Sequence, residues 1–237
     1  MCTLTWLHTG VGLTLWHSRD ERRSRGRAIP PVVEHGNGLA WISPRDSDSG
    51  GTWVGVNTYG VAAGIANLFV NQDPVPPARK VSRGLLVRKL LDSPSSLQVE
   101  RRILAFDLEP FEPFTLVALE VGRAPVILRW DRSALTRLEP LGSGLLVTSA
   151  GGSRSIEASR IRLFEAESRN GELTASRVEE LYRAPPNGDD ASICVHRPEV
   201  STVSLTRIEV SQLQVSLTYT PGQPCQTTPG PTILLER

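Results

Sequence analysis

The feature of this sequence that most constrains its fold is a change in hydrophobic period along the chain. Short apolar runs rich in β-branched residues, some of them alternating with polar residues, come first and are typical of strands. From residue 82 the period becomes helical, with Leu86 and Leu90 on one face. We expect strands at 2–8, 13–18, 38–43, 52–58, 61–70, 114–122, 125–131, 144–148, 191–196, 201–210 and 213–220, and helices at 82–93, 95–106, 155–168 and 173–184.

This order of elements predicts the fold class. Runs of strands separated by runs of helices favour an α+β protein with antiparallel sheets over repeated βαβ units. Residues 19–31 and 44–51 are expected to be loops, the first charged and closed by two prolines. The sequence contains no internal repeat. Residues 184–190 resemble a linker, but too few strands follow it to fold alone, so we expect a single domain over 1–237.

Composition narrows the classes of function. The chain has 237 residues, is 39% hydrophobic and carries a net charge of +1, which is typical of a globular protein and gives no reason to expect a nucleic-acid partner. The N-terminus lacks the basic region of a signal peptide, and no run approaches the ~20 apolar residues of a membrane span. We therefore expect a cytoplasmic protein without a transmembrane segment.

Three cysteines are too few for a disulfide framework. Cys194 and Cys225 either pair or remain two separate half-buried thiols, and His196 is expected to be an ordinary strand residue. Because no pair of residues has metal-ligand spacing, the sequence predicts neither a metal site nor a cofactor.

Cys2 is the candidate nucleophile. Removal of Met1 would leave a thiol and an α-amine on one residue, with ordinary pKa values of about 8.5 and about 7.7–8.0. The amine can then accept the thiol proton directly or through water, so no histidine is needed as a base. The alternative is that Cys2 is only a small buried residue on the first strand.

Four stretches together resemble the NRDE family, the family of the transport and Golgi organisation 2 protein. They are Met-Cys at the start, HSRDER at 17–22, GGTWVGVNTYGVAAGIAN at 50–67 and the tail CVHRP…STVS…YTPGQPC. That family is similar to N-terminal nucleophile hydrolases of the bile acid hydrolase and penicillin V acylase branch, whose GxxxAGxN stretch GVAAGIAN (60–67) matches loosely. The resemblance implies a four-layer αββα sandwich. It also implies hydrolysis of a linear amide (C–N) bond in a small acyl substrate.

The resemblance carries further residues into the candidate site. Arg19 would favour the thiolate, Asp20 would orient the α-amine, and Asn67 would donate a hydrogen bond to the oxyanion. Ser149 stands where the hydrolase branch has a second amide donor, and Ser18 stands where the family motif begins with Asn. Adjacent residues on a regular strand face opposite ways. Arg19 and Asp20 therefore cannot both face Cys2 unless the chain turns there.

Each assignment has a structural alternative. Arg19 and Asp20 could belong to a solvated charge cluster, and Asn67 could cap a turn. The Gly50–Trp53 motif is expected to serve packing, because its glycines permit close backbone approach and Trp53 anchors a hairpin. A second hypothesis for function is a non-catalytic binding or trafficking module for an apolar ligand such as acyl-CoA or haem.

Overall fold

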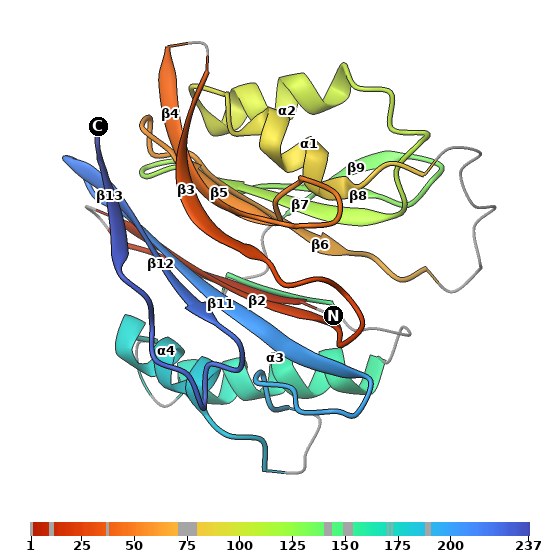
Figure 1. Ribbon diagram of the computed structural model, residues 1–237, viewed down its shortest axis with the longest axis vertical. Coiled ribbons are helices and arrows are strands. Elements are labelled where there is room, and N and C mark those ends of the chain that lie inside the picture. The colour runs from red at the N-terminus through yellow and green to blue at the C-terminus, as the bar shows by residue number, and fades with distance from the viewer. Residues whose placement is uncertain are drawn as a thin grey trace.

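Four stacked layers make up the molecule, as Figure 1 shows: α1 and α2, two antiparallel sheets, then α3 and α4. The structure is a computed structural model that describes residues 2–9, 12–36, 38–70, 80–139, 144–148, 154–169, 171, 173–187 and 191–237. The expected α+β sandwich of αββα type is confirmed.

Sheet A contains both the first strand and the last strands of the chain. Its order is β10-β1-β2-β11-β12-β13, and all neighbours are antiparallel. The bounds are β1 (Cys2–His8), β2 (Leu13–Arg22), β10 (Leu145–Thr148), β11 (Val200–Val210), β12 (Gln214–Pro221) and β13 (Thr232–Glu236). Because β1 lies between β10 and β2, the residue that follows Met1 sits inside the sheet and not at its edge.

Sheet B is built from strands that are consecutive in sequence, β3-β4-β5-β6-β7-β8-β9. The bounds are β3 (Ile29–Gly36), β4 (Leu39–Arg45), β5 (Val54–Asn57), β6 (Ala62–Asn67), β7 (Phe114–Leu119), β8 (Val126–Trp130) and β9 (Leu135–Leu138). The turn between β5 and β6 is the hairpin expected from the sequence, with Gly60 at φ 77°.

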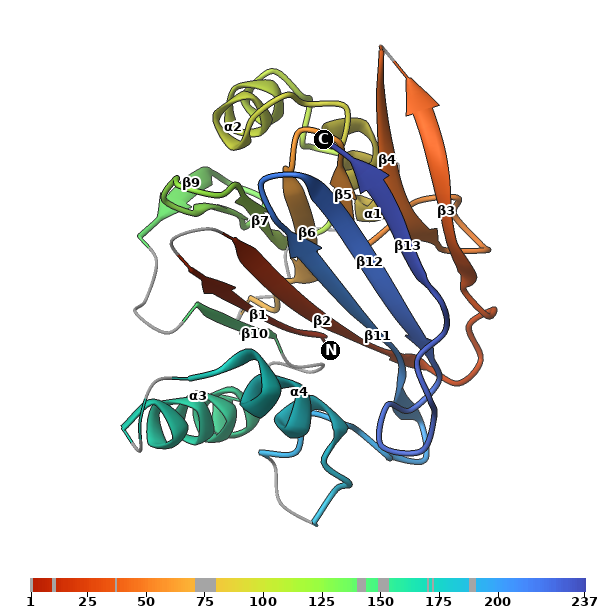
Figure 2. The same ribbon diagram turned by 90° about the vertical axis from the view of Figure 1, so that its left-hand side faces the viewer.

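The helices cover the outer faces of the two sheets (Figures 1 and 2). α1 (Arg83–Leu90) contacts β5 and β6, and α2 (Ser96–Leu104) contacts β7 and β8. α3 (Arg154–Arg169) contacts β10, and α4 (Ala175–Arg183) contacts β2. None of the described helices combines the length and the apolar character needed to cross a bilayer.

Strand alternation divides the hydrophobic residues between two cores. Leu4 and Leu15 of sheet A pack between the sheets with Val54 of sheet B, whereas Trp16 faces the helices and packs with Tyr182. The sheets approach closely at Gly64, where an added Cβ would lie 2.7 Å from Leu4 Cδ1. Successive side chains of β1 and β2 therefore enter two different environments, and this alternation decides how the candidate site is built.

Several of the predictions of loops and strands are wrong. Residues 29–36 form the edge strand β3 although they contain Pro30 and Pro31, because an edge strand tolerates a missing donor N–H; its register also shifts between Ile29 and Val32. β9 and β13, two further edge strands, were not expected. Residues 191–196 were expected to be a strand but form only an isolated bridge, His196 to Ser201.

His17 is a buried imidazole between the sheets, and it makes stability depend on pH. Its Nε2 donates to the Ile65 carbonyl oxygen at 3.2 Å, and burial lowers its pKa from 6.5 to about 4. The pKa of His17 is lower in the folded than in the unfolded protein. The stability that its neutral imidazole contributes is therefore fully present above about pH 6.5 and is lost as the pH falls toward 4. We expect the free energy of unfolding to fall there with a slope approaching about 1.4 kcal/mol per pH unit from this residue.

Urea unfolding at several pH values tests this prediction. His17→Gln should remove this part of the slope, whereas His35→Gln, on the exposed strand β3, should leave it in place. Equal slopes in the wild type and His17→Gln would show that His17 is not the titrating group.

Candidate active site

Cys2 opens β1 and faces the space between the sheets. It alternates in phase with Leu4 and Trp6 of the inter-sheet core and is 8% exposed. Its backbone is paired with Arg19 of β2 on one side and with Thr148 of β10 on the other. Cys2 lines a cavity of about 120 Å³. The predicted residues Arg19, Asp20 and Asn67 line the same cavity, so the structure brings these four together.

Arg19 is the neighbour of Cys2 across the strand pair, on the same face of sheet A. Its guanidinium lies 4.4 Å from the centre of the Trp53 ring, and its Nη2 donates to Asp46 Oδ2 at 2.5 Å. Asp46 also accepts from Arg25 at 2.9 Å and from the backbone N–H of Ser49. Although burial opposes ionisation, these hydrogen bonds and the charge of Arg19 hold the pKa of Asp46 well below its usual range. Arg19 is thus fixed as a charged group in a buried position.

Asp20 lies on the opposite face of sheet A, toward the helices. Its Oδ1 accepts from Thr202 Oγ1 of β11 at 2.6 Å. Burial raises the pKa of Asp20, and the positive charge of Arg160 on α3 opposes that rise. The sequence analysis expected that Arg19 and Asp20 could not both face Cys2 unless the chain turned there. The chain does not turn: β2 pairs with β1 in regular register, and of the two residues Arg19 shares the face of the Cys2 side chain. Asp20 still lines the cavity because Cys2 stands at the end of its strand.

The Cys2 thiol has opposing electrostatic neighbours. Burial is the largest influence and raises the pKa of the thiol, and the nearby Asp20 carboxyl acts in the same direction. The charge of Arg19 lowers the pKa, as the sequence analysis expected, but burial outweighs it. With Met1 in place the thiol is therefore held in its protonated form.

Of the two predicted oxyanion donors, Asn67 lies in the described part of the structure and Ser149 does not. Asn67 is the last residue of β6, is half-buried, and lines the cavity from sheet B. Ser149 lies outside the described residues. The strand before it, β10, ends with Thr148 opposite Cys2, so the expected proximity of this strand to Cys2 holds for its backbone.

Three residues of the Gly50–Trp53 motif line the cavity next to the start of α1: Gly51, Thr52 and Trp53. The N–H of Thr52 donates to the Gly84 carbonyl oxygen at 3.0 Å, and a Cβ added to Gly51 would lie 2.5 Å from the Gly84 carbonyl carbon. This close backbone approach supports the packing role expected for the glycines. Asp46, Ser49 and Arg83 also line the cavity and were not predicted, since the sequence presents 44–51 only as a polar loop and Arg83 only as part of a helix.

A second, larger cavity of about 620 Å³ adjoins the first and shares Arg19, Glu21 and Arg25 with it. Its remaining wall includes Tyr219 and residues 221–223. Three further arginines line it: Arg22, Arg23 and Arg27. A ligand that fills both cavities would place one end beside Cys2 and the other among arginine side chains.

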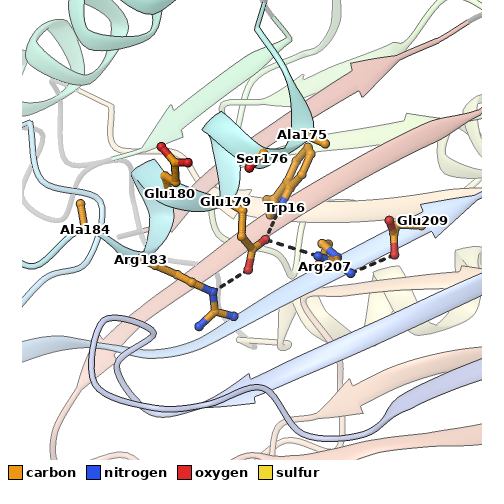
Figure 3. A pocket seen from close by; sticks show the side chains of 9 residues that line it. All are labelled: Trp16, Ala175, Ser176, Glu179, Glu180, Arg183, Ala184, Arg207 and Glu209. Carbon is orange, nitrogen blue, oxygen red and sulfur yellow. Dashed lines mark hydrogen bonds and ion pairs between the residues drawn. The ribbon is translucent and has the colours of Figure 1, made fainter.

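A third cavity, of about 550 Å³, lies beside α4 (Figure 3). Its centre is Glu179, which accepts from Trp16 Nε1 at 2.7 Å and from Arg183 Nε at 2.6 Å, with Arg207 also near (Figure 3). Glu179, Arg183, Arg207 and Glu209 are linked by ion pairs within this cavity. None of the predicted site residues that the structure describes lines it. We therefore place the candidate active site at Cys2.

Three solved structures with a similar fold carry the names of an acylase, an amidase and a hydrolase. Penicillin V acylase from Agrobacterium tumefaciens has a TM-score of 0.59 at 11% identity, with 100% of this chain and 86% of the other covered. The Caenorhabditis elegans ortholog of N-acylethanolamine-hydrolyzing acid amidase has a TM-score of 0.60 at 13% identity, covering 88% and 92%. A mutant of conjugated bile acid hydrolase from Clostridium perfringens has a TM-score of 0.59 at 10% identity, covering 100% and 96%.

These likenesses show that the fold is that of the N-terminal nucleophile hydrolases. The curated proteins include no match to the sequence. A model of the family described as Transport and Golgi organisation 2 matches residues 1–170, which is more than half of the chain. The chain therefore belongs to the Transport and Golgi organisation 2 family.

Proposed function

We propose that the protein is a cysteine N-terminal nucleophile hydrolase that cleaves the amide C–N bond of a small acyl substrate. The observation that carries this proposal is the position of Cys2. It follows Met1, begins an internal strand, and lines a cavity together with Arg19, Asp20 and Asn67. The solved structures with this fold include an acylase, an amidase and a bile acid hydrolase, which supports the same class of reaction.

Acylation would begin once Met1 has been removed. The α-amine of Cys2 takes the thiol proton, and the sulfur attacks the carbonyl carbon of the substrate to form a C–S bond. The Asn67 side-chain amide and backbone N–H groups donate to the oxyanion that results. The tetrahedral intermediate collapses, the C–N bond breaks, and the leaving amine takes the proton back from the α-ammonium.

Deacylation would reverse these roles with water as the nucleophile. The α-amine accepts a proton from water as its oxygen attacks the thioester carbon. The C–S bond then breaks and the sulfur recovers a proton, which releases a carboxylic acid. Asp20 would hold the α-amine in place from the helix side of the sheet, and Arg19 would favour the sulfur anion on the cavity side.

The proposal is tested by two versions of the protein that differ only at the amine. One begins at Cys2, and the other carries an added glycine before it. Incubation with a p-nitrophenyl ester of a short fatty acid should acylate Cys2 far faster in the first version, as intact mass and peptide mapping will show. Equal acylation of both versions, or acylation of Cys194 or Cys225 instead, would contradict the mechanism.

The larger cavity favours a second candidate function, a non-catalytic binding module. Its volume of about 620 Å³ and its arginines suit an apolar ligand with anionic groups, such as acyl-CoA or haem, and Cys2 does not line it. If this function holds, ligand binding measured by calorimetry should survive Cys2→Ala, and the version that begins at Cys2 should not hydrolyse amides or esters above background.

A further inference from the structure

We propose that Cys194, His196 and Cys225 form a Zn²⁺ site. Cys194 Sγ lies 3.1 Å from Cys225 Sγ and 3.3 Å from His196 Nε2, and His196 Nε2 lies 3.0 Å from Cys225 Sγ. Cys194 and Cys225 are free thiols without a disulfide, which was one of the two expected alternatives, but their sulfur atoms are in contact. His196 was expected to be a strand residue and lies in an isolated bridge. This cluster does not line the cavity of Cys2.

Two of the ligands come from one segment that is fixed against β11. The N–H of Val195 donates to Thr202 Oγ1 at 2.8 Å, and the N–H of Thr202 donates to the Val195 carbonyl oxygen at 2.9 Å. Val195 packs with Ile156 of α3, while the side chains of Cys194 and His196 both lie against Cys225.

The third ligand comes from a turn that is fixed independently. The N–H groups of Gln226 and Thr227 donate to the Gln223 carbonyl oxygen at 2.9 and 3.0 Å. Arg183 of α4 donates to the Pro224 carbonyl oxygen at 3.0 Å. Cys225 is thus presented to the other two ligands by hydrogen bonds that do not involve its own side chain, which is the preorganisation that a metal site requires.

The donor set selects the ion. Two thiolates and an imidazole match the preference of Zn²⁺ for sulfur and nitrogen in tetrahedral geometry. With Zn–S of about 2.3 Å and Zn–N of about 2.1 Å, tetrahedral ligand atoms lie roughly 3.5–3.8 Å apart. The three atoms, at 3.0 to 3.3 Å from one another, would need to move apart by about 0.3–0.7 Å to reach that geometry. Within the described part of the chain three groups supply ligand atoms, and a water molecule would complete the fourth position.

Bound zinc would connect this segment to the turn at 223–227. Thr202, which pairs with the segment, also donates to Asp20. The ion would therefore restrict the motion of Thr202, which holds Asp20 in place, and would raise the stability of the fold. It would not contact a substrate.

The test uses the full chain, purified under reducing conditions and stripped of metal by a chelator. Titration with Co²⁺ should reach one equivalent per chain and give thiolate-to-cobalt charge-transfer bands, which Zn²⁺ then abolishes by displacement. Zn²⁺ should also raise the melting temperature. Cys225→Ser and His196→Gln should each weaken metal binding at least tenfold, whereas Cys2→Ser, which keeps all three proposed ligands, should bind as the wild type does.

Two results would overturn the proposal. One is a wild-type chain, with its thiols shown to be free by thiol titration, that binds neither Co²⁺ nor Zn²⁺ in stoichiometric amount. The other is a disulfide between Cys194 and Cys225 that persists under the reducing conditions of purification. If one variant fails to fold, the other and the wild-type titration still decide the question.

Discussion

Cys2→Ala, prepared so that the chain begins at residue 2, should lose amide and ester hydrolysis by about 10³-fold or more, because removal of a covalent nucleophile leaves only binding and oxyanion stabilisation. Cys2→Ser keeps a weaker nucleophile and should retain part of the activity. Initial rates with the same p-nitrophenyl ester measure both effects. Because Cys2 contributes a small side chain at the end of β1, circular dichroism should show that both variants fold.

Turnover by Cys2→Ala within about threefold of the wild type would remove Cys2 from the reaction. The activity would then have to come from elsewhere in the molecule, and the N-terminal nucleophile mechanism would be abandoned.

Asp20→Asn should lower kcat by about 10²-fold, since an amide keeps the shape of the carboxyl and its acceptor for Thr202 but cannot hold an ammonium group by charge. The pH profile separates this role from a structural one. Burial raises the pKa of Asp20, so kcat/KM of the wild type should fall on the acid side at a pH above the usual range of an aspartate. In Asp20→Asn the step that comes from Asp20 should disappear, whereas the limb that comes from protonation of the Cys2 α-amine should remain.

Asp48→Asn is the matched control, because it removes the same charge from a half-exposed carboxylate near Arg25. It should leave both kcat and the pH profile unchanged. An Asp20→Asn variant whose acid-side profile is identical in shape to that of the wild type, at whatever rate, would assign the step to a group other than Asp20.

Much of the fold could be predicted from the sequence because both hydrophobic periods are strong. The buried strands of both sheets follow from runs such as VAAGIAN and FTLVAL, and the helices from apolar faces such as that of Leu86 and Leu90. The strands that were missed are edges. β3, β9 and β13 have much of one face exposed, so prolines, threonines and charged residues are tolerated there and the pattern is weak.

The candidate site could be predicted only in part. Cys2, Arg19, Asp20 and Asn67 were named because their residue types and motifs fit a known chemistry. The partners that fix them could not be named, because contacts such as Arg19 to Asp46 and Asp20 to Thr202 join segments distant in sequence. The same reason hid the cluster of Cys194 and Cys225, whose side chains meet only once β11 and the turn at 223–227 are in place.

The unequal construction of the two sheets sets an order of events during synthesis. Sheet B joins strands that follow one another from residue 29 to 138, so it can assemble as soon as they leave the ribosome. β2 must wait for β11, which begins at Val200, and at about 5–20 residues per second this delay is on the order of 10 s. Throughout that interval β2 has only β1 as a partner in sheet A, while β1 can already pair with β10 once residues 145–148 have been made. This interval is available for removal of Met1 by an aminopeptidase before sheet A is complete.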